Sequence, residues 1–192
     1  MSKLIIHPFF DEQTCTITYV LSDKATSQAA IIDPVLDFDA NSGKVSTKSA
    51  DAIIDYLDEQ NLHLEWILET HAHADHMSGA AYIKEKRGGK TGVGSNITIV
   101  QSTFKKIFNL NQDMVCDGSQ FDVLFENDEV FSLGHLQIEV MHTPGHTPAC
   151  VSYLIEGNIF VGDTIFMPDF GTARTDFPNG SANALFKSIQ KI

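Results

Sequence analysis

The chain has 192 residues, of which 43% are hydrophobic, and a formal net charge of -12. This size allows one sizeable core, so we expect a single domain over residues 1–192. The negative charge, with only 13 Lys and Arg residues, argues against a nucleic-acid partner and against a membrane surface. The three cysteines are widely spaced, and neither a signal peptide nor a membrane span is indicated, which predicts a cytoplasmic protein.

Strands dominate the first third of the chain. β-Branched residues between turn-forming ones predict strands at residues 4–9, 16–21, 29–32 and 64–69. Residues 37–46 lack periodicity and predict a loop. The stretch 46–60 that follows this loop predicts a helix, because Ile53, Ile54 and Leu57 fall on one helical face.

Further helices and short strands alternate in the rest of the chain. The alanine-rich stretch after residue 79 predicts a helix closed by Gly88 and Gly89, and further helices are expected over 103–109 and from Ser181. Strands are predicted between them at 121–124, 129–133, 136–142, 151–155 and 158–161. The pattern favours two packed sheets with helices outside. The second block offers one helix and looks incomplete, so we expect a domain truncated at its C-terminus.

Residues 70–79, T-H-A-H-A-D-H-M-S-G, crowd three histidines and one aspartate into a loop at the end of a predicted strand. Imidazole and carboxylate groups are the ligand types that bind ions such as zinc or iron. The plain alternative, a polar surface loop, does not explain this crowding. We therefore predict that His71, His73, Asp75 and His76 take part in a metal site.

Two later segments offer further ligands. In M-H-T-P-G-H-T, a Pro-Gly turn follows a strand and can direct His146 away from the sheet, whereas His142 fits a strand residue. In F-V-G-D-T, Asp163 directly follows an apolar strand, where a carboxylate needs a partner or a cation. For an isolated Gly-Asp a turn or a helix cap would be the simpler reading, but the histidines favour a ligand.

The order H-x-H-x-D-H, T-P-G-H-T and G-D resembles the metallo-β-lactamase superfamily. The segments ETHAHADH, TPGHTPAC, FVGDTIFMPD, GTARTDFPNG and IIDPVLDFD resemble its persulfide dioxygenase branch, particularly the bacterial β-lactamase-like hydrolase subgroup. This resemblance implies an α/β (α+β) fold: an αββα sandwich of two mixed β-sheets, with helices on the outer faces and the metal at one edge.

The resemblance implies an iron-dependent dioxygenase that oxidises glutathione persulfide with O2 to sulfite and glutathione, as in sulfide detoxification. One Fe(II) per chain would be bound by His71, His146 and Asp163. Such a set of two histidines and one carboxylate leaves open positions on the metal. His73, Asp75 and His76 would then orient the ligands and hold metal-bound water.

The other candidate catalytic residues are Asp75 and Arg174. Arg174, in G-T-A-R-T-D-F, matches an arginine that family members keep near the active site. Its guanidinium could bind a glutathione carboxylate, or it could brace the loop through Asp176. Cys150 lacks an evident base partner, so we interpret it as a buried thiol.

Two rival functions follow from the same residues. In a hydrolase of the glyoxalase II type, two Zn(II) or mixed metals cleave a glutathione thioester, with Asp75 and His76 matching the second metal site and Asp163 bridging the ions. His73 could hold the second metal together with Asp75 and His76. The other rival is a non-catalytic metal-binding module. Family members often form dimers, so a homodimer is expected, with a sulfurtransferase as a further partner. Family members also continue beyond the position of Ile192, where a last histidine and part of the glutathione pocket lie.

Overall fold

The structure is a computed structural model that describes residues 3–111 and 113–192. It divides into two compact units. The first unit contains Met1–Glu69, His73–Thr91 and Ser132–Gln137, and the second contains Thr70–Ala72, Gly92–Phe131 and Ile138–Ile192. The histidine-rich loop is thus divided, because His71 belongs to the second unit and His73 to the first.

Four strands of the first unit pair side by side, and all four were predicted. These are β1 (Leu4–Asp11), β2 (Thr16–Asp23), β3 (Gln28–Ile32) and β6 (His63–Leu68). The first three pair antiparallel in chain order, and β3 then pairs in parallel with β6. The parallel pairing places the carboxyl ends of β3 and β6 at the same edge, where Asp33 and Glu69 follow their strands.

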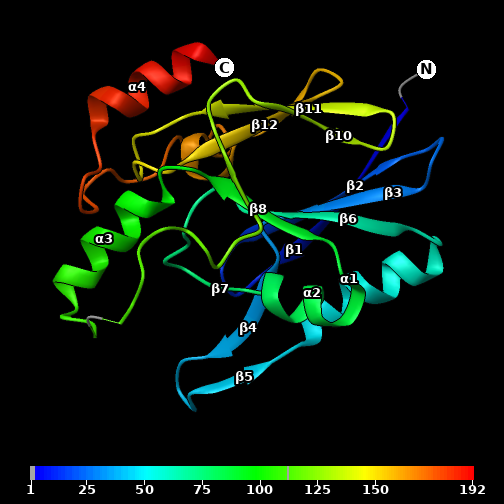
Figure 1. Ribbon diagram of the computed structural model, residues 1–192, viewed down its shortest axis with the longest axis horizontal. Helices are drawn as coiled ribbons and strands as arrows, with labels where there is room; N and C mark the ends of the chain where they lie inside the picture. The colour runs from blue at the N-terminus through cyan, green and yellow to red at the C-terminus, as the bar shows by residue number, and fades with distance from the viewer. Residues whose placement is uncertain (1–2, 112) are drawn as a thin grey trace. The chain divides into compact units, whose positions relative to one another are not determined.

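Two helices of the first unit, α1 (Lys48–Glu59) and α2 (Ala80–Arg87), contact each other and confirm the predicted helices (Figure 1). Their buried face matches the apolar periodicity of the sequence, since Ile53 and Leu57 of α1 are buried and Ile54 is partly buried. The core that they join is aliphatic, which is the usual basis of such packing. Its buried members are Val20, Ala29, Ile31, Ala50, Ile53, Leu57, Leu62, Ile67, Ala80 and Ile83.

The prediction of a loop over residues 37–46 was wrong. Strands β4 (Val35–Asp39) and β5 (Lys44–Ser46) form an antiparallel hairpin there, and β7 (Met77–Ser78) pairs with β4 (Figure 1). The turn is held by Asp39, whose carboxylate accepts hydrogen bonds from the N–H groups two and three residues on. The polar residues that suggested a loop therefore build a hairpin turn.

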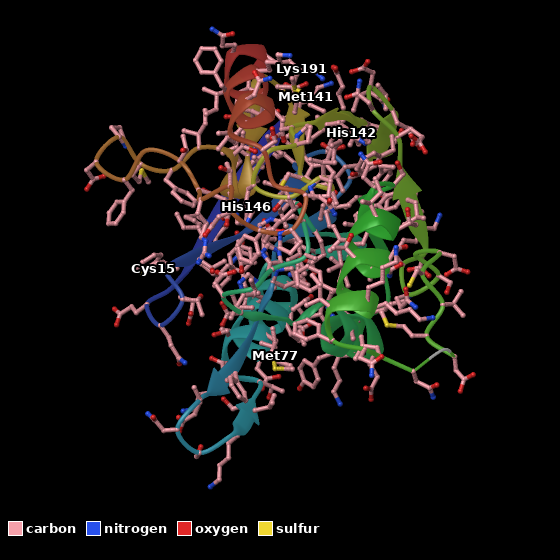
Figure 2. All side chains as sticks on the ribbon, turned by 90° about the vertical axis from the view of Figure 1, so that its left-hand side faces the viewer. Cys15, Met77, Met141, His142, His146 and Lys191 are labelled. Carbon is pink, nitrogen blue, oxygen red and sulfur yellow. The ribbon has the colours of Figure 1, made fainter. Side chains whose placement is uncertain are left out.

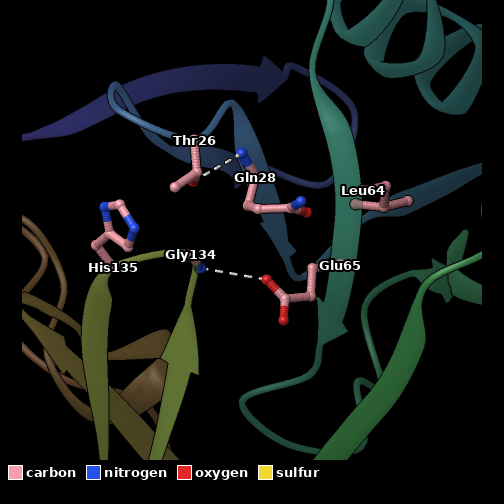
Figure 3. A pocket seen from close by; sticks show the side chains of 6 residues that line it. All are labelled: Thr26, Gln28, Leu64, Glu65, Gly134 and His135. Atoms are coloured by element: carbon pink, nitrogen blue, oxygen red, sulfur yellow. Dashed lines mark hydrogen bonds between the residues drawn. The ribbon is translucent and has the colours of Figure 1, made fainter.

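The tip of the hairpin between β10 (Val130–Leu133) and β11 (Leu136–His142) belongs to the first unit and is held by buried Asp23. The Asp23 carboxylate accepts hydrogen bonds from the N–H groups of His135 at 2.8 Å and Ala25 at 2.9 Å. Figure 3 shows the surrounding pocket, in which the Gly134 N–H donates to Glu65. These hydrogen bonds lower the pKa of Asp23.

Asp23→Asn is expected to destabilise the protein by about 2–3 kcal/mol at pH 7, because bonds to a charged acceptor are replaced by a poorly matched amide. A carboxyl whose pKa is lowered by folding stabilises above its unfolded pKa of about 3.9, and that contribution is lost as the pH falls through the folded value. Urea unfolding from pH 7 to pH 3 should therefore show the gap to the unchanged protein closing below about pH 4. Asp55→Asn, on α1, is the control. A gap that stays constant over this range would contradict the assignment.

The second unit contains two sets of strands. Val93 and Gly94 of β8 (Lys90–Gly94) pair in parallel with β9 (Val123–Phe125). β11, β12 (Val151–Ile155) and β13 (Asn158–Phe160) follow one another antiparallel. A short 3-10 helix, Gly162–Thr164, comes directly after β13. Strands β9 to β13 confirm the predicted series to within two residues at each end.

The helices of the second unit are α3 (Ile97–Ile107) and α4 (Ala182–Lys191). The predicted final helix is confirmed, with the Ser181 side chain capping its N-terminus. The prediction for α3 was wrong at its start, which lies six residues before Thr103. The β-branched run at that start resembles a strand, but Ile97 and Val100 are buried against Val93, so packing outweighs local propensity. Among the described residues, none of the helices has the length and hydropathy that a membrane crossing requires.

Candidate metal centre

The second unit brings together His71, His146 and Asp163. His71 follows β6, His146 follows the Pro-Gly turn after β11, and Asp163 lies in the 3-10 helix after β13. One ligand-type atom from each lies within 4.8 Å of the others. The Oδ2 atom of Asp163 is 3.6 Å from His71 Nε2 and 3.4 Å from His146 Nε2. The sequence-predicted ligand set is therefore gathered at one point.

Both histidines of this set are oriented by hydrogen bonds at the other ring nitrogen. His146 Nδ1 lies 2.8 Å from the carbonyl oxygen of Arg174, so it carries a hydrogen and donates it, which leaves the Nε2 lone pair facing Asp163. His71 Nδ1 lies 3.0 Å from Thr70 Oγ1. The two rings are perpendicular, with centroids 5.1 Å apart. Such partners fix which nitrogen is presented to a metal.

The geometry of the set fits a metal ion. Ligand atoms at about 2.1 Å from a shared ion lie about 3 Å apart in adjacent positions, slightly closer than the 3.4 and 3.6 Å seen here. Small side-chain movements would close the set. The His71 and His146 side chains are buried, whereas that of Asp163 is 31% exposed. Two imidazoles and one carboxylate are the donors of mononuclear iron sites with open positions.

Gly162 lies between two of these candidate ligands in the packing of the second unit. Its φ is +49°, in the left-handed region that favours glycine. A Cβ atom at this position would collide with the Thr70 side chain, the partner of His71. The glycine of the G-D motif therefore lets the backbone before Asp163 lie directly on the residue that orients His71.

The first unit brings together His73, Asp75 and His76, which also place one ligand-type atom each within 4.8 Å. Asp75 Oδ2 lies 3.2 Å from His76 Nδ1, and the Thr16 hydroxyl donates to Asp75 at 3.2 Å. Burial raises the pKa of Asp75, but the His76 hydrogen bond and charge outweigh it and lower that pKa overall. In the described part of the chain, the buried Nε2 atom of His76 has no hydrogen-bond partner. Such an atom suits a metal ligand or a bound water.

Two buried carboxylates hold His73, and the sequence analysis missed both roles. His73 Nε2 lies 3.1 Å from Asp33 Oδ1 and 3.1 Å from Glu69 Oε2. Burial alone would lower the pKa of His73, but the two carboxylates raise it well above its usual value. Burial raises the pKa of Glu69 against the opposing effect of His73. A signal was present, because Glu69 follows an apolar strand just as Asp163 does.

The backbone carbonyl of Arg174 contacts His146 of the set with His71 and Asp163, while the Arg174 side chain pairs with Asp176. The guanidinium donates two hydrogen bonds to Asp176, at 2.5 and 2.8 Å, and lies 4.9 Å from the Phe177 ring centroid. Hydrogen bonds to Asp176 raise the pKa of Arg174. Phe177 in turn packs edge-on against His146, with centroids 5.0 Å apart. These contacts are those of a brace, and the substrate-binding role of Arg174 stays a prediction.

His142 and Cys150, which the sequence favours as structural residues, both make hydrogen bonds within the second unit. His142, labelled with His146 in Figure 2, ends β11, and its Nε2 lies 3.2 Å from the carbonyl oxygen of Phe125. Cys150 is buried, and its sulfur lies 3.3 Å from the donating N–H of Thr147. Both agree with the structural readings given to them above.

Comparison with known proteins supports the family resemblance. A family model described as "Metallo-beta-lactamase superfamily" matches residues 14–192. "Glyoxylase B2" of Dictyostelium discoideum is 53% identical over 100% of this chain and 66% of its own length. "Beta-lactamase hydrolase-like protein" of Agrobacterium fabrum is 52% identical over 97% of this chain and 43% of its own length. "Persulfide dioxygenase ETHE1, mitochondrial" of Homo sapiens is 28% identical over 99% and 63%, respectively.

A solved structure agrees with these relatives. The structure titled "Crystal structure of ETHE1 from Myxococcus xanthus" has a TM-score of 0.78 and 29% identity, covering 98% of this chain and 69% of that one. This likeness confirms the expected α/β class and fold. The chain spans between 43% and 66% of the length of the three curated relatives named above.

Proposed function

Because the chain belongs to the metallo-β-lactamase superfamily, whose members bind metal ions, we propose that it is an iron-dependent dioxygenase acting on glutathione persulfide. The observation that supports this most directly is the set His71, His146 and Asp163, in which two imidazoles and one carboxylate converge. This donor set is typical of non-haem Fe(II) enzymes that use O2. The human relative, named as a persulfide dioxygenase, favours the same function.

The proposed reaction converts glutathione persulfide, O2 and water into glutathione and sulfite, with release of two protons. When bound, Fe(II) supplies open positions at which the persulfide sulfur and O2 come together. The protein's part is to orient the ligands: the Arg174 carbonyl fixes the His146 tautomer, and Thr70 holds His71. The Phe177 ring packs on His146 and limits its rotation.

We propose a separate role for each of the remaining candidates. Asp75, kept ionised by its lowered pKa, is proposed to hold a water molecule through its charged oxygens. Asp176 takes two of the five N–H donors of Arg174, and the side chain is 67% exposed, so other donors can bind a glutathione carboxylate. A homodimer, a sulfurtransferase partner and a cytoplasmic location stay predictions.

A hydrolase of the glyoxalase II type is the second candidate. It is favoured by the 53% identity to Glyoxylase B2 and by the second ligand-type set, His73, Asp75 and His76. Such an enzyme would use two Zn(II) or mixed metals and add water to a glutathione thioester, releasing glutathione and a carboxylic acid. The two candidates differ in metal, in oxygen dependence and in substrate.

The test is oxygen uptake by protein loaded anaerobically with Fe(II), on addition of glutathione persulfide, with Zn(II)-loaded protein as the control. The proposal expects uptake with iron only, together with sulfite equal to the O2 consumed. Oxygen uptake without persulfide would contradict the mechanism. Absence of oxygen uptake with both metals would overturn the dioxygenase proposal. Hydrolysis of a glutathione thioester by the Zn(II) form would then support the second candidate.

A further inference from the structure

Glu69 uses both of its carboxylate oxygens to hold one segment of the histidine-rich loop, residues 70–79. It follows Leu68, the last residue of β6, and its side chain is only 4% exposed. Oε2 lies 3.1 Å from His73 Nε2, and Oε1 accepts a hydrogen bond from the Ser78 hydroxyl. The two contacts bracket residues 73–78, which carry Asp75 and His76.

The far end of this segment is fixed to the rest of the first unit. Ser78 Oγ accepts a hydrogen bond from the Ala80 N–H at 3.0 Å, at the start of α2. Ser78 also pairs with Val35 of β4, and the Gly79 N–H donates to Pro34 O at 2.7 Å. Glu69 therefore connects the loop segment to a strand, a helix and a hairpin that are themselves held.

The near end is fixed through the ring of His73. Because its Nε2 faces two carboxylate oxygens, which only accept, Nε2 must carry a hydrogen. In the neutral ring, Nδ1 is then the His73 nitrogen that carries the lone pair a metal ion would need. The ring also packs against that of His76, with the two planes tilted by 34° and the centroids 4.1 Å apart. Without Glu69, Nε2 would lose one of the two carboxylates that face it, and the orientation of the ring would be less firmly fixed.

We propose that Glu69 is a positioning residue of the metal centre, which sets the orientation and tautomer of His73 and fixes Ser78. It thereby presents Asp75 and His76 in the geometry described above. The inference rests on the proposed function only in treating this loop as part of a metal centre, and it holds for one metal ion or for two.

The experiment compares Glu69→Ala, Glu69→Gln and Ser78→Ala with the unchanged protein. Glu65→Gln is the matched control, because Glu65 lies in β6 and bonds Gly134 instead. Two-bond 1H–15N spectra of the metal-free protein, recorded above the raised pKa of His73 so that the ring is neutral and assigned with His73→Asn, report which His73 nitrogen carries the hydrogen. Competition with a chromophoric chelator reports the Zn(II) affinity. Neither readout requires turnover, so the inference can succeed where the proposed function fails.

Glu69→Ala is expected to lose the single Nε2–H pattern of His73 and to bind Zn(II) about 10–100-fold more weakly, the usual cost of losing an outer partner. Glu69→Gln can keep both contacts through its amide and should stay within about threefold of the unchanged protein. Ser78→Ala should weaken Zn(II) binding in the same direction, which keeps the test decisive if Glu69→Ala does not fold. An unaltered tautomer and affinity in Glu69→Ala and Ser78→Ala, or an equal loss in Glu69→Gln and Glu69→Ala, would overturn the proposal.

Discussion

His146→Ala is expected to abolish metal retention. Changes to the partners of metal ligands commonly weaken binding about 10–100-fold, so removal of a ligand should weaken it by more than about 100-fold. His146 Nε2 lies 3.4 Å from Asp163 Oδ2, and its loss leaves one histidine and one carboxylate in the set. Elemental analysis after anaerobic loading and gel filtration should show about one iron per chain in the unchanged protein and very little iron in the variant.

The matched control is His142→Ala, four residues earlier in the chain. His142 bonds the Phe125 carbonyl and does not belong to either histidine set, so the variant should keep its iron. His71→Ala and Asp163→Ala should behave as His146→Ala does. Full iron occupancy in any of these three variants would refute the ligand assignment. His76→Ala separates the two functions, since the dioxygenase should keep its iron and the hydrolase should lose metal stoichiometry.

Gly145→Ala is expected to destabilise the protein by about 2–5 kcal/mol and to weaken metal binding as well. Its φ is +152°, a backbone conformation that residues other than glycine rarely adopt. A Cβ atom would also lie 2.5 Å from the Leu185 backbone nitrogen, and helix backbone cannot yield as a side chain can. Two hydrogen bonds join α4 and its N-cap to this turn: the Ser181 N–H donates to Gly145 O, and the Ser188 hydroxyl donates to Pro144 O. The collision would therefore move the turn that presents His146.

Urea unfolding and chelator competition measure both effects of this substitution. Gly157→Ala is the control, because Gly157 has a φ of +75° but no described heavy atom within 4 Å of an added Cβ. It carries the backbone strain, of order 1 kcal/mol, without the collision. If Gly145→Ala proved as stable as Gly157→Ala and kept its metal affinity, the close approach of α4 would not be what positions His146.

Local patterns in the sequence predicted the strands β1, β2, β3 and β6 and the helices α1, α2 and α4. Their signal lies within a few residues, as in the apolar face of α1 at Ile53 and Leu57. The prediction failed where partners far away decide the outcome. Residues 37–46 form a hairpin because β4 finds β5 and β7 to pair with, and α3 begins at Ile97 because buried neighbours accept its apolar side.

The candidate ligands could be singled out because their chemistry is unusual in sequence: His71, His146 and Asp163 each lie in a short motif at a strand end. Which groups orient them was decided only by the tertiary structure. The Arg174 carbonyl that fixes His146, and the Asp33 and Glu69 carboxylates that hold His73, come from segments whose approach depends on sheet pairing and packing. A backbone oxygen leaves no trace in residue identity, and a carboxylate that follows an apolar strand indicates only that it needs a partner, not which residue that partner is.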